Sequence, residues 1–191
     1  QMVVKGLDFE NVNLVGILDA DSLLSFADFR VNERAFQLME QVSGRAGRKD
    51  GEGKVMIQVA QVTHPVLGYL AAHNYELFYK NEIEARKQFG YPPFSRTIQL
   101  TFKHRVKDVV AGAANAFALA LKAEFGKFMM GPAEPVVNRV RNQFLMGLLL
   151  KLPKDTALTN RCKAQIHDQI AVLHNDKNFR AVVIIPDVDA V

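Results

Sequence analysis

Apolar runs near the start of the chain predict two strands of a parallel sheet. Residues 13–19, NLVGILD, hold a continuous apolar run that ends in Asp19, a pattern typical of a strand buried on both faces. Residues 54–60 hold a second run after a turn rich in glycine and acid. Because a helical pattern lies between the two runs, residues 1–60 predict a βαβ unit of an open parallel sheet.

The helix between these strands is predicted to have one apolar face. Its apolar residues recur at spacings of three and four, which places them on one side of a helix. They are Ala35, Leu38, Met39 and Val42. Asn32 is the predicted N-cap, and the helix is expected to end near Gly47.

The second half of the chain predicts the order βαββαβ. Alternating apolar and polar residues predict a half-buried strand over 97–103. Residues 136–141 and 143–152 read as a strand pair that turns near Asn142, and the last strand is expected over 181–186. Two helical patterns separate these strands, with apolar residues at Val106, Val110, Ala113, Phe117 and Leu121, and at Cys162, Ile166, Ile170 and Leu173. This order predicts a small α+β sandwich with a mostly antiparallel sheet.

A proline pair marks the connection between the two halves. The segment GYPPF, residues 90–94, ends a helical stretch that begins at Pro65. We expect a first domain over residues 1–75 and a second over 76–191, with a helical connection to about residue 94. The predicted fold class is α/β, with part of a parallel-sheet domain followed by a small α+β domain.

Composition limits the classes of protein that fit. The chain has 191 residues, of which 49% are hydrophobic, so a core can form. No stretch approaches 18 apolar residues, and the start lacks the apolar core of a signal peptide, so we expect a cytoplasmic protein without a membrane span. The one cysteine, Cys162, excludes an internal disulfide and is interpreted as a buried hydrophobe. The net charge of +4 permits a polyanionic partner without requiring one.

The candidate chemistry lies in residues 41–48, QVSGRAGR. Arg45 and Arg48 offer planar forks of donors that suit phosphate oxygens, and the glycines allow close approach of the backbone. The alternative is that both arginines lie at a helix C-terminus and meet solvent. The motif by itself leaves both interpretations open.

Longer segments resemble a family of helicases. Residues 1–9, QMVVKGLDF, resemble motif V of superfamily 2 helicases, and QVSGRAGR resembles their motif VI. The segments DFR…ER…QL…QVSGRAGR, EARKQFGYPPFSR, GPAEPVVNRVRNQF and IIPDVDAV are similar to the primosomal protein N′ family of replication-restart helicases. The resemblance runs along the whole chain, although Ala190 stands where the family usually has proline and no Gly-x-x-x-x-Gly-Lys-Ser/Thr loop is present.

The resemblance implies a RecA-like helicase lobe 2 in the first domain, with roles for its motif residues. Arg48 would contact the γ-phosphate of ATP, and Arg45 would assist it. The other positions assigned to nucleotide binding or coupling are Gln41, Gly44, Asp8 and Gly6. Asp8 could instead be a turn carboxylate, and Lys5 contacts either the DNA backbone or a nearby acid.

Charged residues before motif VI are assigned a structural role. Asp28, Arg30, Glu33 and Arg34 are expected to form a local lattice of salt bridges that positions the motif VI helix. Asp19 and Asp21, at a predicted strand end, could orient motif V or line a cleft, and the sequence does not decide between these roles.

Two surfaces of the second domain are candidates for binding. The predicted DNA-binding residues there are Arg139, Arg141, Lys103 and Arg105, for which a solvated face is the alternative. Arg161 and Gln165 lie one helical turn apart and match positions associated in the family with the acidic tail of single-stranded-DNA-binding protein. Decoration of a helix surface is the alternative for this pair.

The resemblance implies the C-terminal portion of an ATP-dependent 3′ to 5′ DNA helicase that recognises stalled or branched forks and starts primosome assembly. ATP and Mg²⁺ would be held mainly by a first lobe, and zinc by an upstream insertion, with no metal site in this chain. The expected partners are single-stranded and branched DNA, single-stranded-DNA-binding protein and other primosome proteins. We expect this chain alone to be catalytically inactive, and the alternative is a non-catalytic DNA- and protein-binding module.

Overall fold

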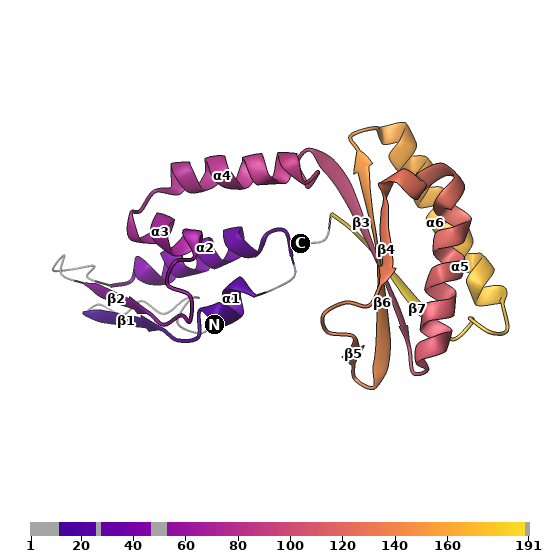
Figure 1. Cartoon of the computed structure of the whole chain (residues 1–191), viewed down its shortest axis with the longest axis horizontal. Coiled ribbons are helices and arrows are strands. Elements are labelled where there is room, and N and C mark those ends of the chain that lie inside the picture. Colours follow the sequence, from indigo (N-terminus) through magenta and orange to yellow (C-terminus); the bar gives the residue numbers. More distant parts are fainter. Residues whose placement is uncertain (1–11, 26–27, 47–52, 190–191) are drawn as a thin grey trace. The chain divides into compact units, whose positions relative to one another are not determined.

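The chain divides into two compact units. The computed structural model describes residues 12–25, 28–46 and 53–189. The division falls between Ala85 and Arg86, inside helix α4 (Tyr75–Gln88) (Figure 1). Each unit has a hydrophobic core of its own.

The described residues of the first unit form two parallel strands and four helices. Strand β1 (Leu14–Ile17) pairs with β2 (Lys54–Ile57), from Leu14 opposite Lys54 to Ile17 opposite Ile57. The helices are α1 (Asp21–Leu24), α2 (Val31–Ser43), α3 (Pro65–Ala71) and α4. The predicted strand, helix and parallel strand are therefore confirmed.

The predicted burial of the first strand on both faces is wrong. Only Val15 of β1 is buried, and Leu14 is 56% exposed. Within the part of the chain that the structure describes, β1 pairs with β2 alone, and the exposure of Leu14 shows that one face of β1 is open. The run of apolar residues therefore predicted the strand correctly, but it did not predict how many of its side chains are buried.

Aromatic stacking joins α2 to α4 inside the first unit. The rings of Phe36 and Phe78 lie 4.5 Å apart and within 8° of parallel, and both are buried. Their neighbours in this core include Ala35, Met39 and Leu70. Phe36 was not among the apolar residues predicted for the helix, because its burial depends on α4.

The ends of α2 differ from the prediction. The helix begins at Val31, with Arg30 as its N-cap, so Asn32 lies in the first turn. The Asn32 amide instead donates to Glu82 Oε1 of α4 at 2.8 Å. The C-cap is Gly44, whose backbone N–H donates to Glu40 O at 2.9 Å, so the helix ends before Gly47.

The second unit is a five-stranded antiparallel sheet with two helices on one face (Figure 1). The spatial order of these strands is β4-β6-β3-β7, and the short β5 pairs with β6. In chain order the elements are β3 (Ser95–His104), α5 (Lys107–Phe125), the 3-10 helix Gly126–Phe128, β4 (Met129–Ala133), β5 (Arg139–Val140), β6 (Gln143–Pro153), α6 (Thr156–Asn175) and β7 (Val183–Val188). The α+β class is confirmed, whereas the order is βαβββαβ and has one strand, β4, more than the predicted βαββαβ.

Alternation along β3 and β6 builds the core of the second unit. Ile98, Leu100 and Phe102 are buried, and they are paired with buried leucines and Met146 of β6. Phe102 meets Phe117 of α5 edge to face, with ring centroids 5.3 Å apart. Val106, which was predicted on the buried face, is instead the exposed N-cap of α5.

Strand β4 was missed by the sequence analysis. Its sequence, MMGPA, lacks alternation, and its register with β6 shifts between Met130 and Ala133. Gly131 has φ 99°, and a Cβ there would lie 2.9 Å from Gly147 O. A glycine is therefore required where β4 crosses close to β6.

Helix α6 begins as predicted and buries the one cysteine. Asp155 is the N-cap, and its carboxylate accepts from the Leu158 amide at 3.0 Å. Cys162 is fully buried, and burial together with the nearby Glu124 charge raises the pKa of its thiol to about 11. The thiol is therefore protonated at neutral pH and acts as a small apolar group, as predicted.

One described helix, residues 107–128, has the length and apolar composition to cross a membrane. Seven residues of α5 are buried in the core of the second unit. This burial accounts for the apolar composition of the helix, since the core helix of a domain meets the same criteria.

Two leucines on α5 test which face of this helix stabilises the second unit. Leu121 is fully buried, whereas Leu119 is 71% exposed. Leu121→Ala should lower the free energy of unfolding by about 2–5 kcal/mol, and Leu119→Ala by less than about 0.5 kcal/mol. Urea denaturation followed by circular dichroism measures both, and equal losses would contradict the packing.

Candidate nucleic-acid interface

The predicted DNA-binding residues of the second unit meet at one end of its sheet. Strand pairing sets Phe144 opposite both His104 and Arg139, so the three residues form one row across β3, β6 and β5. Neighbouring strands lie about 4.8 Å apart, so the row brings Arg139 to about 10 Å from the end of β3. Lys103 and Arg105 flank His104. The basic cluster consists of Lys103, Arg105, Arg139 and Arg141.

Arg139 is held in place by its neighbours in the row. Its guanidinium lies over the Phe144 ring, 4.9 Å from the centroid, and donates a hydrogen bond to Asn142 Oδ1. A cation over an aromatic face loses less mobility when it binds an anion, because part of its ordering is already complete. Neither contact is with an acid, so the positive charge of Arg139 is not neutralised by them.

The other three cations of the basic cluster have no acidic partner among the residues that the structure describes. Lys107, the next cation along the chain, does have one, because its Nζ lies 2.5 Å from Glu134 Oε1. Hydrogen bonds from Lys107 and Asn138 lower the pKa of the Glu134 carboxyl below its ordinary value. Glu134 therefore neutralises Lys107 and leaves the basic cluster unpaired.

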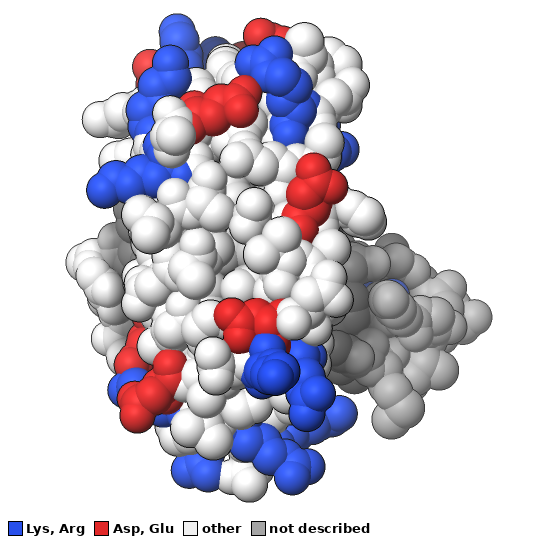
Figure 2. All heavy atoms as spheres, turned by 90° about the vertical axis from the view of Figure 1, so that its right-hand side faces the viewer, with Lys and Arg blue, Asp and Glu red and all other residues white. Residues whose placement is uncertain are grey.

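Charged side chains also gather toward the ends of the helical face of the second unit. Figure 2 shows Lys and Arg side chains gathered toward the upper and lower ends of this face, with a mostly uncharged band between them. Acidic side chains stand beside the cations at both ends. Charge is therefore concentrated at the ends of the sheet, where loops join the elements.

The residues predicted for nucleotide binding in the first unit are only partly described. Lys5, Gly6, Asp8 and Arg48 lie outside the described residues. Gln41, Gly44 and Arg45 come together at the C-terminal end of α2, where the Arg45 amide donates to Val42 O at 3.1 Å. Gln41 is exposed and Arg45 is half-buried.

The lattice of salt bridges predicted ahead of this helix is confirmed. Arg34 Nη1 lies 2.8 Å from Asp28 Oδ2, and Arg30 Nη2 lies 3.1 Å from Glu33 Oε1. The Arg30 backbone N–H, at the N-cap, donates to Asp28 Oδ1 at 2.9 Å. These contacts fix the first turn of α2, which is the structural role that the sequence assigned to them.

The two aspartates after β1 have different positions. Asp21 Oδ2 accepts from the Ala60 amide at 2.7 Å, so it ties the start of α1 to the segment after β2. Asp19 is exposed, with φ 52°, and its carbonyl accepts from the Ser22 hydroxyl at 2.8 Å. Asp21 therefore has a structural contact, and Asp19 shapes the turn into α1.

Arg161 and Gln165 both contact α5. Arg161 Nε donates to Glu124 Oε1 at 2.9 Å across an exposed ion pair, and Gln165 Nε2 donates to Ala120 O at 3.2 Å. The Gln165 Oε1 atom is buried without a hydrogen-bond partner. The two side chains thus lie side by side along the seam between α5 and α6.

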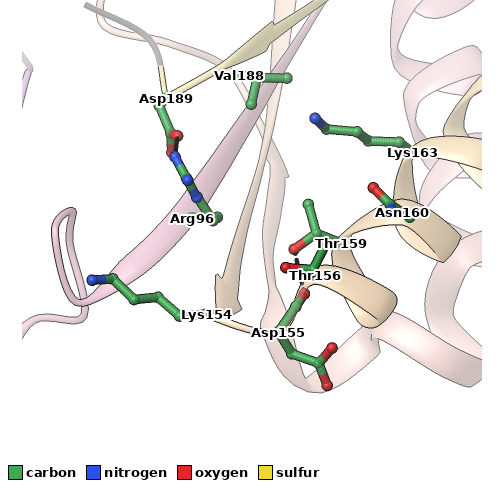
Figure 3. Close-up of a pocket in the computed structure, with 9 residues that line it drawn as sticks. All are labelled: Arg96, Lys154, Asp155, Thr156, Thr159, Asn160, Lys163, Val188 and Asp189. Carbon is green, nitrogen blue, oxygen red and sulfur yellow. Dashed lines mark hydrogen bonds and ion pairs between the residues drawn. The ribbon is translucent and has the colours of Figure 1, made fainter.

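A polar pocket that the sequence did not indicate lies at the start of α6 (Figure 3). Its volume is about 400 Å³, and its walls include Lys154, Thr156 and Lys163. Arg96 and Asp189 close one side through an ion pair of 2.5 Å. These residues come from distant parts of the sequence, so no local motif marks the pocket. It lies at the opposite end of β3 from the basic cluster.

The groups that organise the basic cluster were also missed. Phe144 and Asn142 position Arg139, and Glu134 forms an ion pair with Lys107. The alternation of β6 did indicate Phe144, but as a core residue only. Among the described residues, no group of three or more His, Cys, Asp or Glu side chains is arranged to hold a metal ion.

Comparisons with known proteins agree with one family. A sequence model of the family described as primosomal protein N C-terminal domain matches residues 87–191. Replication restart protein PriA of Bacillus subtilis is 38% identical over 161 residues, which cover 83% of this chain and 20% of that protein.

A second relative extends the similarity to almost the whole chain. Replication restart protein PriA of Haemophilus influenzae is 35% identical over 191 residues, which cover 99% of this chain and 25% of that protein. The chain thus spans about a fifth to a quarter of the length of these relatives. The chain belongs to the PriA family of replication restart proteins, and residues 87–191 are its C-terminal domain.

Proposed function

We propose that the chain works within an ATP-dependent 3′ to 5′ DNA helicase, to which it contributes part of the second RecA-like lobe and a DNA-binding C-terminal domain. Family membership and the parallel βαβ unit of the first unit support this proposal. Recognition of stalled or branched forks, primosome assembly and a cytoplasmic location belong to the same proposal.

The first unit would act on ATP through its arginines. Arg45 lies just beyond α2, and Arg48 follows it by three residues. Two guanidiniums suit the γ-phosphate end of a nucleotide, whereas the sequence has no glycine-rich loop for the remaining phosphates. Bound ATP with Mg²⁺ supplies the phosphoryl transfer and would be held mainly by a first lobe. A zinc site in an upstream insertion is expected only from the family resemblance.

The second unit would hold the DNA backbone at the basic cluster. The single observation that carries this proposal is the row of Arg139, Phe144 and His104, which gathers cations of β3, β5 and the residues that follow them at one sheet end. Cations without acidic partners bind phosphates without reading base sequence. Binding should therefore be independent of sequence and should weaken as salt rises.

A protein partner is the second candidate function, at Arg161 and Gln165. The Arg161–Glu124 pair is exposed, so a carboxylate of a partner could replace Glu124 at modest cost. The neighbouring Gln165 Oε1, buried without a partner, could accept an N–H of the same peptide. We propose the acidic tail of single-stranded-DNA-binding protein as the ligand, with other primosome proteins as further partners.

Replacing two arginines tests the DNA site. Arg139→Ala with Arg141→Ala should weaken binding to forked DNA about tenfold and reduce the slope of log affinity against log salt by about 1–2, since each lost phosphate contact removes about 0.9. Fluorescence anisotropy over a salt series measures both quantities. Lys154→Ala with Lys163→Ala removes the same charge at the other end of β3, and an equal effect of this control pair would contradict the site.

Replacing Arg48 tests the nucleotide role. In a protein that joins this chain to a nucleotide-binding first lobe, Arg48→Ala should lower the ATPase rate by about 10³-fold and leave DNA affinity within about twofold. Lys49→Ala is the matched control, because it removes the same charge at the next residue. A loss of DNA affinity as large as the loss of ATPase rate would show that Arg48 has another role. The chain alone should hydrolyse no ATP.

A peptide titration tests the second candidate. An acidic peptide with a free C-terminal carboxylate should bind the chain, and Arg161→Ala should weaken this binding about tenfold because a charge-assisted hydrogen bond is lost. Lys163→Ala, on another face of α6, should change it little. Isothermal titration calorimetry gives both affinities. Equally tight binding of the same peptide with an amidated C-terminus would contradict the assignment.

A further inference from the structure

Residues 134–143, the arm, expose an unusual set of apolar side chains. Val136, Val137 and Val140 are 90%, 62% and 46% exposed. Single exposed apolar residues are ordinary on a protein surface, but three valines within five positions form a small apolar patch. Two arginines, Arg139 and Arg141, flank Val140 in the sequence.

The arm is held to the sheet at its base and at its returning strand. The Leu145 amide donates to Asn138 O at 2.8 Å, and β5 pairs with the start of β6. Glu134, at the base, is bound by Lys107 and by Asn138. Val140 therefore lies in a paired strand, and Val136 and Val137 lie in a bend that is fastened on both sides.

The tip of the arm has a tight turn with an arginine in an unfavourable conformation. Arg141 and Asn142 have φ values of 47° and 64°, as the two central residues of a type I′ hairpin turn require. Asparagine suits such a position, but arginine does not. The turn nevertheless sets a cation at the tip, and backbone strain of this kind is concentrated at functional sites.

The charge of the arm identifies the kind of partner. No acidic residue occurs between Pro135 and Lys154. Arg139 is held over Phe144, and Arg141 has no ion-pair or hydrogen-bond partner among the described residues. A partner must therefore offer negative charge next to apolar surface. Duplex DNA does so, because its grooves expose sugars and base edges between two rows of phosphates.

The shape of the arm also suits a groove. A two-stranded ribbon fits the major groove, which is about 12 Å wide, and apolar side chains there can contact the methyl group of thymine. In Figure 1 the arm extends from the sheet on the side away from α5 and α6, so neither helix covers it.

We propose that the arm enters a groove of duplex DNA, with Val136 and Val137 against sugars and base edges and with Arg139 and Arg141 on the flanking phosphates. This inference rests on the proposed DNA binding at the basic cluster and adds to it an apolar contact that depends on duplex structure. A single strand would be a different partner, and the experiment separates it from a duplex.

The test replaces the valines without changing any charge. Val136→Ser with Val137→Ser in the 191-residue chain should weaken binding to a 30-base-pair duplex about fivefold at every salt concentration, since apolar contact is lost. The salt slope should stay unchanged, because no cation is removed. Binding to a single strand of the same length should be unaffected. Val172→Ser, an exposed valine of α6, is the matched control. A thermal unfolding curve verifies that both variants are folded.

Two results would overturn the proposal. Unchanged duplex affinity in the valine variant would mean that the arm makes no apolar contact with DNA. An equal loss on duplex and single strand would mean that no groove is involved. In both cases a weaker salt slope in the Arg139→Ala, Arg141→Ala variant would leave the proposed DNA site intact, whereas an unchanged slope in that variant would contradict the site itself.

Discussion

The antiparallel pairing of β3 with β6 is the constraint on which the second unit depends. Ten residue pairs join the two strands, from Ser95 opposite Pro153 to His104 opposite Phe144. A slip of one residue would turn Leu100 and Leu148 away from the helices, so burial of these side chains fixes the register. The same register sets the position of every residue at the ends of the sheet. Packing in the core therefore determines where the cations lie.

The sequence predicts most of this unit because its strands alternate. Ile98, Leu100 and Phe102 recur at every second position and are all buried, so the sequence predicts both the strand and its buried face. Strand β4 has no such period, since Gly131 replaces a side chain where the strand passes close to β6. The local sequence pattern also could not predict the exposure of Leu14, because this exposure depends on which elements pack on β1.

The candidate site was predictable in its residue types but not in its geometry. The sequence shows Arg139, Arg141 and Lys103 as cations of predicted strands, although the predicted strand 136–141 is only Arg139–Val140 and Arg141 lies in the turn. Their proximity comes from the pairing of Phe144 with both neighbouring strands, which no local spacing reveals. The ion pair between Lys107 and Glu134, which neutralises Lys107, is likewise a contact between residues that are distant in the sequence. Family resemblance supplied the remaining assignments, including those of residues that the structure does not describe.

Core packing delivers an unpaired cationic surface to one end of the sheet of the second unit, and we propose that DNA binds there. Hydrogen–deuterium exchange of the 191-residue chain with and without forked DNA tests this claim most directly. We predict that DNA slows exchange in two separate segments, residues 103–107 and 134–145, and leaves residues 154–163 unchanged. Slower exchange confined to residues 154–163, or no change in either predicted segment, would contradict the claim.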